Sequence, residues 1–231
     1  MDPQLLTSLN AARRNRQAAI LVTGLDDGSN RLVMRGDAVA GDLAAAIGKA
    51  FLSGKSGVVE AQGQRFFLNV HLPAPRMVII GAVHISQALA PMAARTGFDV
   101  KVIDPRTAFA TQDRFKGVNL VAEWPEDALR DRSFDAFTAL VAVTHDPKID
   151  DWPLIAALKA EAFYVGALGS RKTHGKRVER LTEAGLSSEQ IARIAAPIGL
   201  DIGAQSPEEI AVAILAQVIA ALRKPEDMGG V

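Results

Sequence analysis

The chain contains no cysteine, and this absence excludes disulfide bonds, thiolate metal ligands and cysteine nucleophiles. It also fits a reducing compartment. Charge of either sign is not in excess, because 26 lysines and arginines balance 26 aspartates and glutamates. Proteins that hold nucleic acid through its phosphates normally carry a basic surplus, so the balance argues against a nucleic-acid partner.

Long apolar runs are also lacking. The longest, Ile210–Leu222, is interrupted by Gln217 and is too short to span about 30 Å of hydrocarbon. The first residues, Met1–Gln4, lack the basic and apolar segments of a signal peptide. These observations predict a cytoplasmic protein that does not associate with a membrane.

Several patterns that carry chemistry in other proteins are missing. No serine lies in a nucleophile elbow, and no Walker loop occurs. The histidines His71, His84 and His174 are scattered without the spacing of metal ligands. We therefore expect no metal site built by the protein, and no catalytic residue can be assigned from motifs.

What the chain does contain divides at Leu72–Arg76. Two prolines in four residues cannot continue a β-ladder and favour an extended connector at this point. Residues 1–72 predict a small N-terminal α+β domain with antiparallel strands, including a hairpin that turns at Gln62-Gly63.

Residues 73–231 change to short apolar strands that alternate with helices. Strands are expected at 77–81, 99–103, 119–122, 136–144, 162–166 and 196–200. Helices are expected at 84–96, 125–131, 150–160, 171–184, 188–194 and 207–223. This alternation predicts a Rossmann-like, doubly wound α/β domain with a parallel sheet and right-handed crossovers.

In an open parallel sheet, ligands bind beyond the carboxyl ends of the strands, near the switch in strand order. This rule selects five loops that are rich in glycine, charge or histidine. They are Gly81–Ser86, Asp104–Thr107, Thr144–Lys148, Gly166–His174 and Gly199–Gln205.

The first of these loops has the position of a dinucleotide phosphate loop. Gly81 fills the first glycine position, but Val83 stands at the second, where a β-branched side chain blocks the approach of a pyrophosphate. Asp104 ends the next strand, where an acidic residue would bind a ribose hydroxyl. The alternative is structural: Gly81 turns the chain and Asp104 caps a turn before Pro105. NAD(P) binding is thus allowed by the fold and disfavoured by Val83.

The loop Gly166–His174 has the most unusual charge pattern. Ser170 is a good N-cap, which places Arg171 and Lys172 in the first turn of the next helix. Cations there oppose the helix dipole by roughly a few tenths of a kcal/mol, unless an anion binds beside them. The pattern favours a phosphate site, and the alternative is a solvated basic helix face. The candidate residues of this loop are Gly166, Gly169, Ser170, Arg171, Lys172 and His174.

Two further loops supply candidates. His145 and Asp146 follow the most apolar strand, and such a pair can serve in acid–base chemistry or metal binding. The alternative is that Asp150 caps the next helix and His145 bonds to the loop. Asp201 and Gly203 precede the last helix and are candidates to face the cleft.

At these residues the chain resembles the XdhC/CoxI family, accessory proteins that mature xanthine dehydrogenase and related molybdenum hydroxylases. The resemblance covers roughly residues 65–223 and implies a small N-terminal domain followed by a Rossmann domain. It adds His84 and Arg106 to the candidate cofactor-binding residues. The matching segments are Pro73–His84, Val102–Arg106, Thr144–Lys148, Tyr164–Arg171 and Pro197–Ala204.

The resemblance implies a binding protein rather than an enzyme. Such a protein binds molybdenum cofactor (molybdopterin) as cargo, protects it during sulfuration and passes it to the apo-enzyme, with the pterin phosphate on the Arg171 loop. The implied partners are a molybdenum hydroxylase of the xanthine dehydrogenase type and a cofactor sulfurase, and a homodimer is allowed. Two alternatives would use the same cleft: an NAD(P)-dependent oxidoreductase and a nucleotide-sensing regulatory module.

Two features depart from the family pattern. Val83 stands where the family commonly has glycine. The N-terminal domain is short, and it lacks the glycine-rich motif with a cysteine that the family usually carries there. A thiolate contact to molybdenum is excluded, so we expect a short and divergent member of the family.

Overall fold

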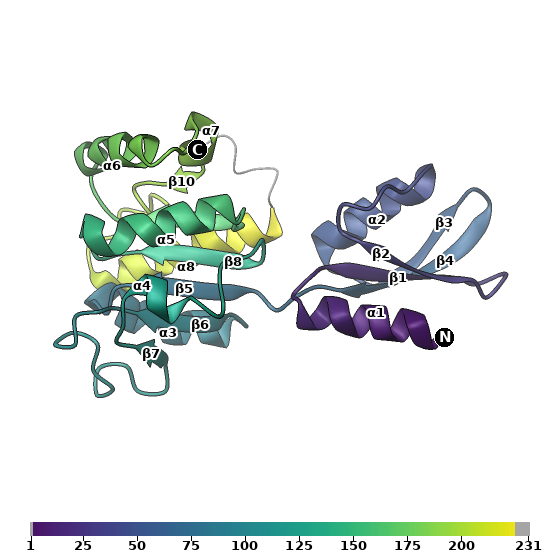
Figure 1. The fold of residues 1–231 in the computed structure, drawn as a ribbon, viewed down its shortest axis with the longest axis horizontal. Helices are drawn as coiled ribbons and strands as arrows, with labels where there is room; N and C mark the ends of the chain where they lie inside the picture. Colours follow the sequence, from purple (N-terminus) through teal and green to yellow (C-terminus); the bar gives the residue numbers. More distant parts are fainter. Residues whose placement is uncertain (1, 225–231) are drawn as a thin grey trace. The chain divides into compact units, whose positions relative to one another are not determined.

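The computed structural model describes residues 2–224 and shows two compact units, divided between Pro73 and Ala74 (Figure 1). The N-terminal unit is an antiparallel sheet with the strand order β2-β1-β4-β3. The predicted hairpin is confirmed, because Ala61 pairs with Gln64 and Gln62-Gly63 form the turn, both with positive φ. The elements of this unit are α1 (Pro3–Arg14), β1 (Ala19–Gly24), β2 (Asn30–Met34), α2 (Asp42–Ser53), β3 (Gly57–Ala61) and β4 (Gln64–His71).

The C-terminal unit is built on a six-stranded sheet with the order β10-β9-β8-β5-β6-β7, in which every neighbouring pair is parallel. The chain proceeds outward from β5 to β7, then returns to β8 and proceeds outward on the other side. This is the doubly wound order, and the switch in direction lies between β5 and β8. The predicted Rossmann-like fold is confirmed. The strands are β5 (Arg76–Ile80), β6 (Asp99–Ile103), β7 (Asn119–Val121), β8 (Thr138–Ala142), β9 (Tyr164–Ala167) and β10 (Ile194–Ala195).

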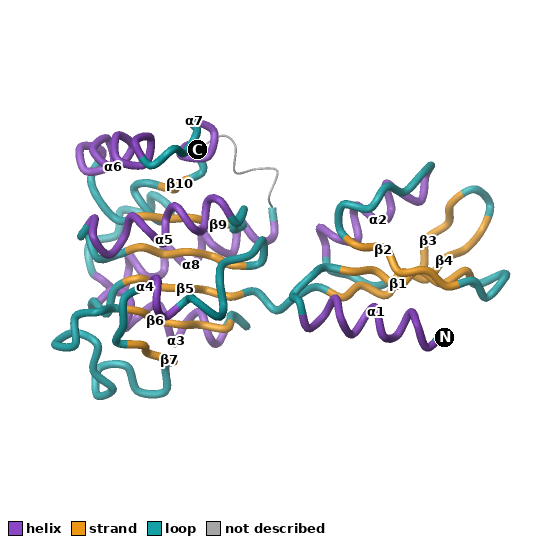
Figure 2. The backbone as a smooth tube through the Cα atoms, viewed as in Figure 1, coloured by secondary structure: helices purple, strands orange, loops and turns teal. Residues whose placement is uncertain are grey.

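Helices cover both faces of this sheet, and Figure 2 shows the strands as a layer between them. Alternate residues of a strand point to opposite faces. In β5, Met77 and Ile79 therefore pack in the core with α3 and α8, whereas Val78 and Ile80 pack in the core with α5. Burial on both faces explains why the sequence shows continuous apolar strands. The helices are α3 (His84–Arg95), α4 (Pro125–Ala128), α5 (Pro147–Lys159), α6 (Arg171–Glu183), α7 (Ser188–Ala192) and α8 (Pro207–Arg223).

One predicted strand is absent, and one predicted helix begins earlier than expected. Residues 196–200 do not form a strand: Pro197 has no N–H for a ladder, and the N–H of Gly199 donates to the side-chain oxygen of Gln217 at 2.8 Å. The helix expected from residue 150 begins at Pro147. Its N-cap is Asp146, whose carboxylate accepts the N–H of Lys148 at 3.0 Å.

No helix within residues 2–224 has the length and apolar character needed to cross a membrane.

Candidate functional site

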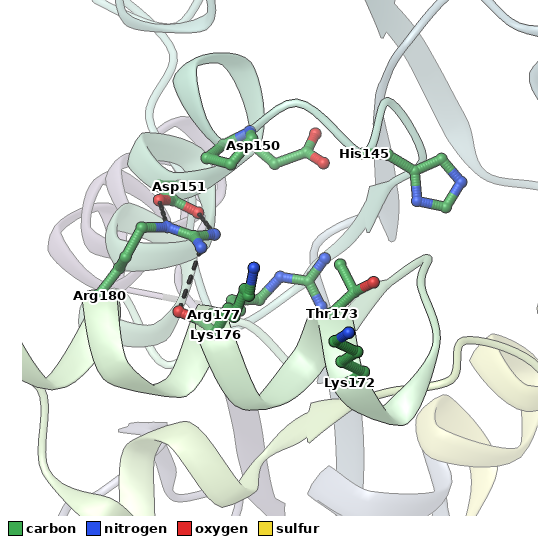
Figure 3. Close-up of a pocket in the computed structure, with 9 residues that line it drawn as sticks. His145, Asp150, Asp151, Lys172, Thr173, Lys176, Arg177 and Arg180 are labelled. Carbon is green, nitrogen blue, oxygen red and sulfur yellow. Dashed lines mark hydrogen bonds and ion pairs between the residues drawn. The ribbon is translucent and has the colours of Figure 1, made fainter.

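A cavity of about 310 Å³ lies between α5 and α6, beside the loop that follows β8 (Figure 3). Carboxylates from α5 face ammonium and guanidinium groups from α6 across it, and cations outnumber carboxylates. The nine lining residues are His145, Pro147, Asp150, Asp151, Lys172, Thr173, Lys176, Arg177 and Arg180. The cavity therefore suits a negatively charged ligand better than a neutral one.

The cap and the period of α6 put these cations on one face. The predicted N-cap is confirmed, because the Ser170 hydroxyl accepts the N–H of Thr173 at 3.2 Å. Lys172, Lys176 and Arg180 then follow at intervals of four residues, which aligns them along one side of a helix. Arg171 is exposed and is not among the lining residues.

Arg177 is the buried cation of the cavity. Its side chain is 2% exposed, and its Nη2 donates to the carbonyl oxygen of Leu168 at 2.8 Å. Nε and Nη1 are buried and have no hydrogen-bond partner among residues 2–224. Burial lowers the pKa of Arg177, and the charges of Asp150 and Asp151 oppose that shift. A buried guanidinium with two nitrogens that lack an acceptor is costly, so it indicates a place for an oxyanion.

Asp150 faces the same cavity from α5. It is 2% exposed, and its Oδ1 accepts the hydroxyl proton of Thr144 at 2.7 Å. Burial raises the pKa of Asp150 to about 6, although Thr144 and Arg177 favour the charged form. The alternative in which Asp150 caps the helix is wrong, since Asp146 is the cap. Asp151 differs, because Arg180 binds both of its oxygens at 2.6 and 3.0 Å.

The two predicted residues of the β8–α5 loop, His145 and Asp146, have different roles in the structure. His145 is exposed, lines the cavity, and has a φ of 63°, a left-handed conformation that is uncommon outside glycine. Asp146 uses its carboxylate to cap α5. His174 lies within α6, where burial and the charge of Arg177 lower its pKa. The Nδ1 atom of His174 is buried without a partner among residues 2–224.

The backbone N–H groups of the loop after β5, where a dinucleotide phosphate would bind, already donate to side chains of the protein. The N–H of Ala82 donates to Asp104 at 2.7 Å, and the N–H of Val83 donates to the Ser86 hydroxyl at 2.8 Å. Arg106 also binds both oxygens of Asp104, at 2.9 and 2.8 Å. Burial by itself would raise the pKa of Asp104, but the hydrogen bonds from Arg106 and Ala82 bring it below its usual value. The amides and the carboxylate that would hold a dinucleotide are thus engaged.

Gly81 turns the chain tightly beside this loop. Its φ is 117°, and a Cβ atom there would stand 2.9 Å from Cγ2 of Thr144. Only glycine fits this close approach of β5 to the end of β8.

Of the predicted site residues, His145 and Lys172 line the cavity, and the others in residues 2–224 lie outside its lining. Sequence reasoning left Asp150, Asp151 and the α6 cations beyond Lys172 out of the candidate set. The four-residue spacing of charges along α6 was the available signal for those cations. The candidates outside the lining are Gly81, His84, Asp104, Arg106, Asp146, Gly166, Gly169, Ser170, Arg171, His174, Asp201 and Gly203.

The strand order defines a Rossmann-like α/β domain, and the cavity at the carboxyl edge of its sheet is the candidate ligand site. Within that class, residues 77–218 match the XdhC Rossmann domain, and the chain belongs to the XdhC family. The predicted family is confirmed.

Two curated relatives are similar in sequence. The chain is 34% identical over 159 residues to a probable xanthine dehydrogenase subunit from Bacillus subtilis (strain 168), a match that covers 68% of this chain and 46% of the relative. It is 33% identical over 156 residues to "Molybdenum cofactor insertion chaperone PaoD" of Escherichia coli (strain K12), covering 67% of this chain and 43% of the relative. The matches thus span less than half the length of either relative.

One solved structure shares the fold. A crystal structure of a xanthine dehydrogenase from Bacillus halodurans aligns with 98% of this chain and 66% of its own, at a TM-score of 0.62 and 24% identity. This likeness shows a common fold.

Proposed function

We propose that this chain takes part in molybdenum cofactor maturation: it binds the cofactor as cargo and delivers it to an enzyme of the xanthine dehydrogenase type. Membership of the XdhC family and the names of the two relatives support this role. The role requires holding and releasing a ligand rather than transforming it. We further propose a cofactor sulfurase as a second partner, a homodimer as the working form, and the cytoplasm as its location.

Arg177 is the observation that carries the proposal. Molybdopterin ends in a phosphate, and a guanidinium group donates charge-assisted hydrogen bonds to phosphate oxygens. Two nitrogens of Arg177, Nε and Nη1, are buried without an acceptor among residues 2–224, and Arg177 lines the cavity together with Lys172 and Lys176. The cofactor's phosphate would accept a hydrogen bond from one of these nitrogens, and its charge would be balanced by the lysines. The chain has no cysteine, so no thiolate holds the molybdenum end.

The test is a titration of the purified full chain with molybdopterin, followed by fluorescence. Replacing Lys172 and Lys176 together by alanine should weaken binding by about tenfold or more, because two charges near the phosphate are lost. The matched control replaces Lys148 and Lys159, two exposed lysines of α5 outside the cavity lining, and should leave the affinity unchanged. Equal effects of both pairs, or no binding by the wild type, would overturn the assignment.

Delivery is tested by mixing the loaded chain with apo-xanthine dehydrogenase. Activity should return faster with the loaded chain than with free molybdopterin, and the double lysine variant should lose this advantage. Equal recovery with free cofactor would limit the chain to storage.

The nicotinamide and nucleotide-sensing alternatives need the loop after β5. Its amides at Ala82 and Val83 already have acceptors within the protein, so we expect no tight binding of NADPH or ATP. A calorimetric titration that showed tight binding of either nucleotide would favour those alternatives instead.

A further inference from the structure

The cavity holds a buried carboxylate opposite its buried cation, and this is unusual for a site that only attracts anions. We propose that Asp150 makes the cavity selective for oxyanions that bring a proton, so that it accepts hydrogen phosphate, or a phosphomonoester in its monoprotonated form, and rejects sulfate and phosphodiesters. The inference rests on the proposed function, because it concerns the same anion site.

The geometry holds Asp150 as a hydrogen-bond acceptor. The Thr144 hydroxyl oxygen accepts the N–H of Asp146 at 3.0 Å, and the hydroxyl lies 2.7 Å from Oδ1 of Asp150. One oxygen of Asp150 is thereby oriented from behind while the carboxylate faces the cavity (Figure 3). Asp151 cannot take this role, because Arg180 engages both of its oxygens.

The other charged groups do not discriminate between oxyanions. Lysine and arginine attract sulfate and phosphate alike, and the charge of the other carboxylate, Asp151, is balanced by Arg180. Arg106, in the loop after β6, also interacts electrostatically with Asp146 and Asp150. The titratable and charged groups that line the cavity with Asp150 are His145, Asp151, Lys172, Lys176, Arg177 and Arg180.

The proton decides which anion is bound. Hydrogen phosphate donates its own O–H to the Asp150 carboxylate, which forms a short charge-assisted hydrogen bond. Sulfate and phosphodiesters carry no proton at neutral pH, so they bind only after Asp150 has taken one from water. Burial raises the pKa of Asp150 to about 6. At pH 7.5 the uptake of that proton would weaken sulfate binding by roughly thirtyfold, at tenfold per pH unit.

The experiment is a calorimetric titration of the full chain with inorganic phosphate and with sulfate, at pH 7.5 and constant ionic strength. Wild type should bind phosphate at least about thirtyfold more tightly than sulfate. In Asp150→Asn the amide donates a hydrogen bond to either anion, while Thr144 can still donate to Oδ1. Sulfate binding should tighten by about thirtyfold, and the preference for phosphate should disappear. The control Asp151→Asn should change both affinities by the same factor.

A second measurement needs only the wild type. Titrations in two buffers of different ionisation enthalpy should show an uptake of about one proton per sulfate bound and much less per phosphate. Equal affinities for the two anions in the wild type, or a preference that persists in Asp150→Asn, would overturn the inference. If the anions bind equally and Arg177→Met weakens both, the anion site stands and only the selectivity is wrong. If neither binds, both proposals fail.

Discussion

Arg177→Met separates a ligand-binding arginine from a structural one. The variant keeps an unbranched side chain of similar length at this buried position but removes the charge and all five N–H donors. In the free protein it loses the hydrogen bond to the Leu168 carbonyl oxygen. It also relieves the burial of Nε and Nη1, which have no acceptor among residues 2–224.

The two effects on stability oppose each other. A hydrogen bond from a charged group contributes about 1.5–3 kcal/mol, and each buried unsatisfied donor costs about 1–3 kcal/mol. We therefore expect the free energy of unfolding of Arg177→Met to equal that of the wild type within about 2 kcal/mol, or to exceed it. Phosphate affinity should fall by about tenfold or more, because a charge-assisted bond of about 1.5–3 kcal/mol is lost.

Arg76 provides the contrast. It is 5% exposed, and its Nη2 binds the carboxylate of Asp135 and the carbonyl oxygen of Ser133, each at 2.8 Å. Arg76→Met removes this ion pair together with the hydrogen bond to Ser133 and should cost about 3–5 kcal/mol. Urea denaturation gives the free energy of unfolding of each variant, and calorimetric titration gives its affinity for phosphate. If Arg177→Met destabilises the protein as much as Arg76→Met and binds phosphate normally, Arg177 is a structural residue and the reasoning fails.

Three further predictions test the fold and the site. Burial raises the pKa of Asp150 from 3.8 to about 6, so the folded state keeps a proton that the unfolded state releases, and stability is lost as the pH rises through this window. Relative to Asp150→Asn, the free energy of unfolding of the wild type should fall by up to about 3 kcal/mol between about pH 4 and 6, and no further above pH 6. Urea denaturation of both proteins across this pH range measures the difference, and a difference that stays constant with pH would contradict the prediction. Gly81→Ala should lower the free energy of unfolding in urea by about 2–3 kcal/mol, because Gly81 has a positive φ and a Cβ atom there would contact Thr144. The control Gly175→Ala, in open space on α6, should raise it by about 1 kcal/mol. Equal effects of the two substitutions would contradict the close approach at Gly81. Limited proteolysis near Pro73 should release a C-terminal fragment that melts cooperatively; a chain that is degraded throughout, with no stable fragment, would show that the units depend on each other.

Local sequence signals determined the architecture of the C-terminal unit. Runs such as Met77–Ile80 are apolar throughout because both faces of a parallel strand are buried, and this makes them visible without the tertiary structure. Ser170 caps α6 through an N–H only three residues away, so its role also follows from sequence. The segments shared with the XdhC family are likewise contiguous, and they identified the family before any geometry was available.

The tertiary structure decided what those elements do to one another. Arg171 and Arg177 are both basic residues of α6, yet one is exposed and the other is buried, because the docking of α6 against α5 selects which face is covered. Asp150 has the residue type of a helix cap but becomes a buried carboxylate, since the cap lies four residues earlier at Asp146. Burial, pairing and pKa depend on neighbours that are distant along the chain, and a pattern of residue types contains no record of those neighbours. The packing of the helices on the sheet therefore determines the cavity between α5 and α6, whereas the local sequence determines where the helices and strands form.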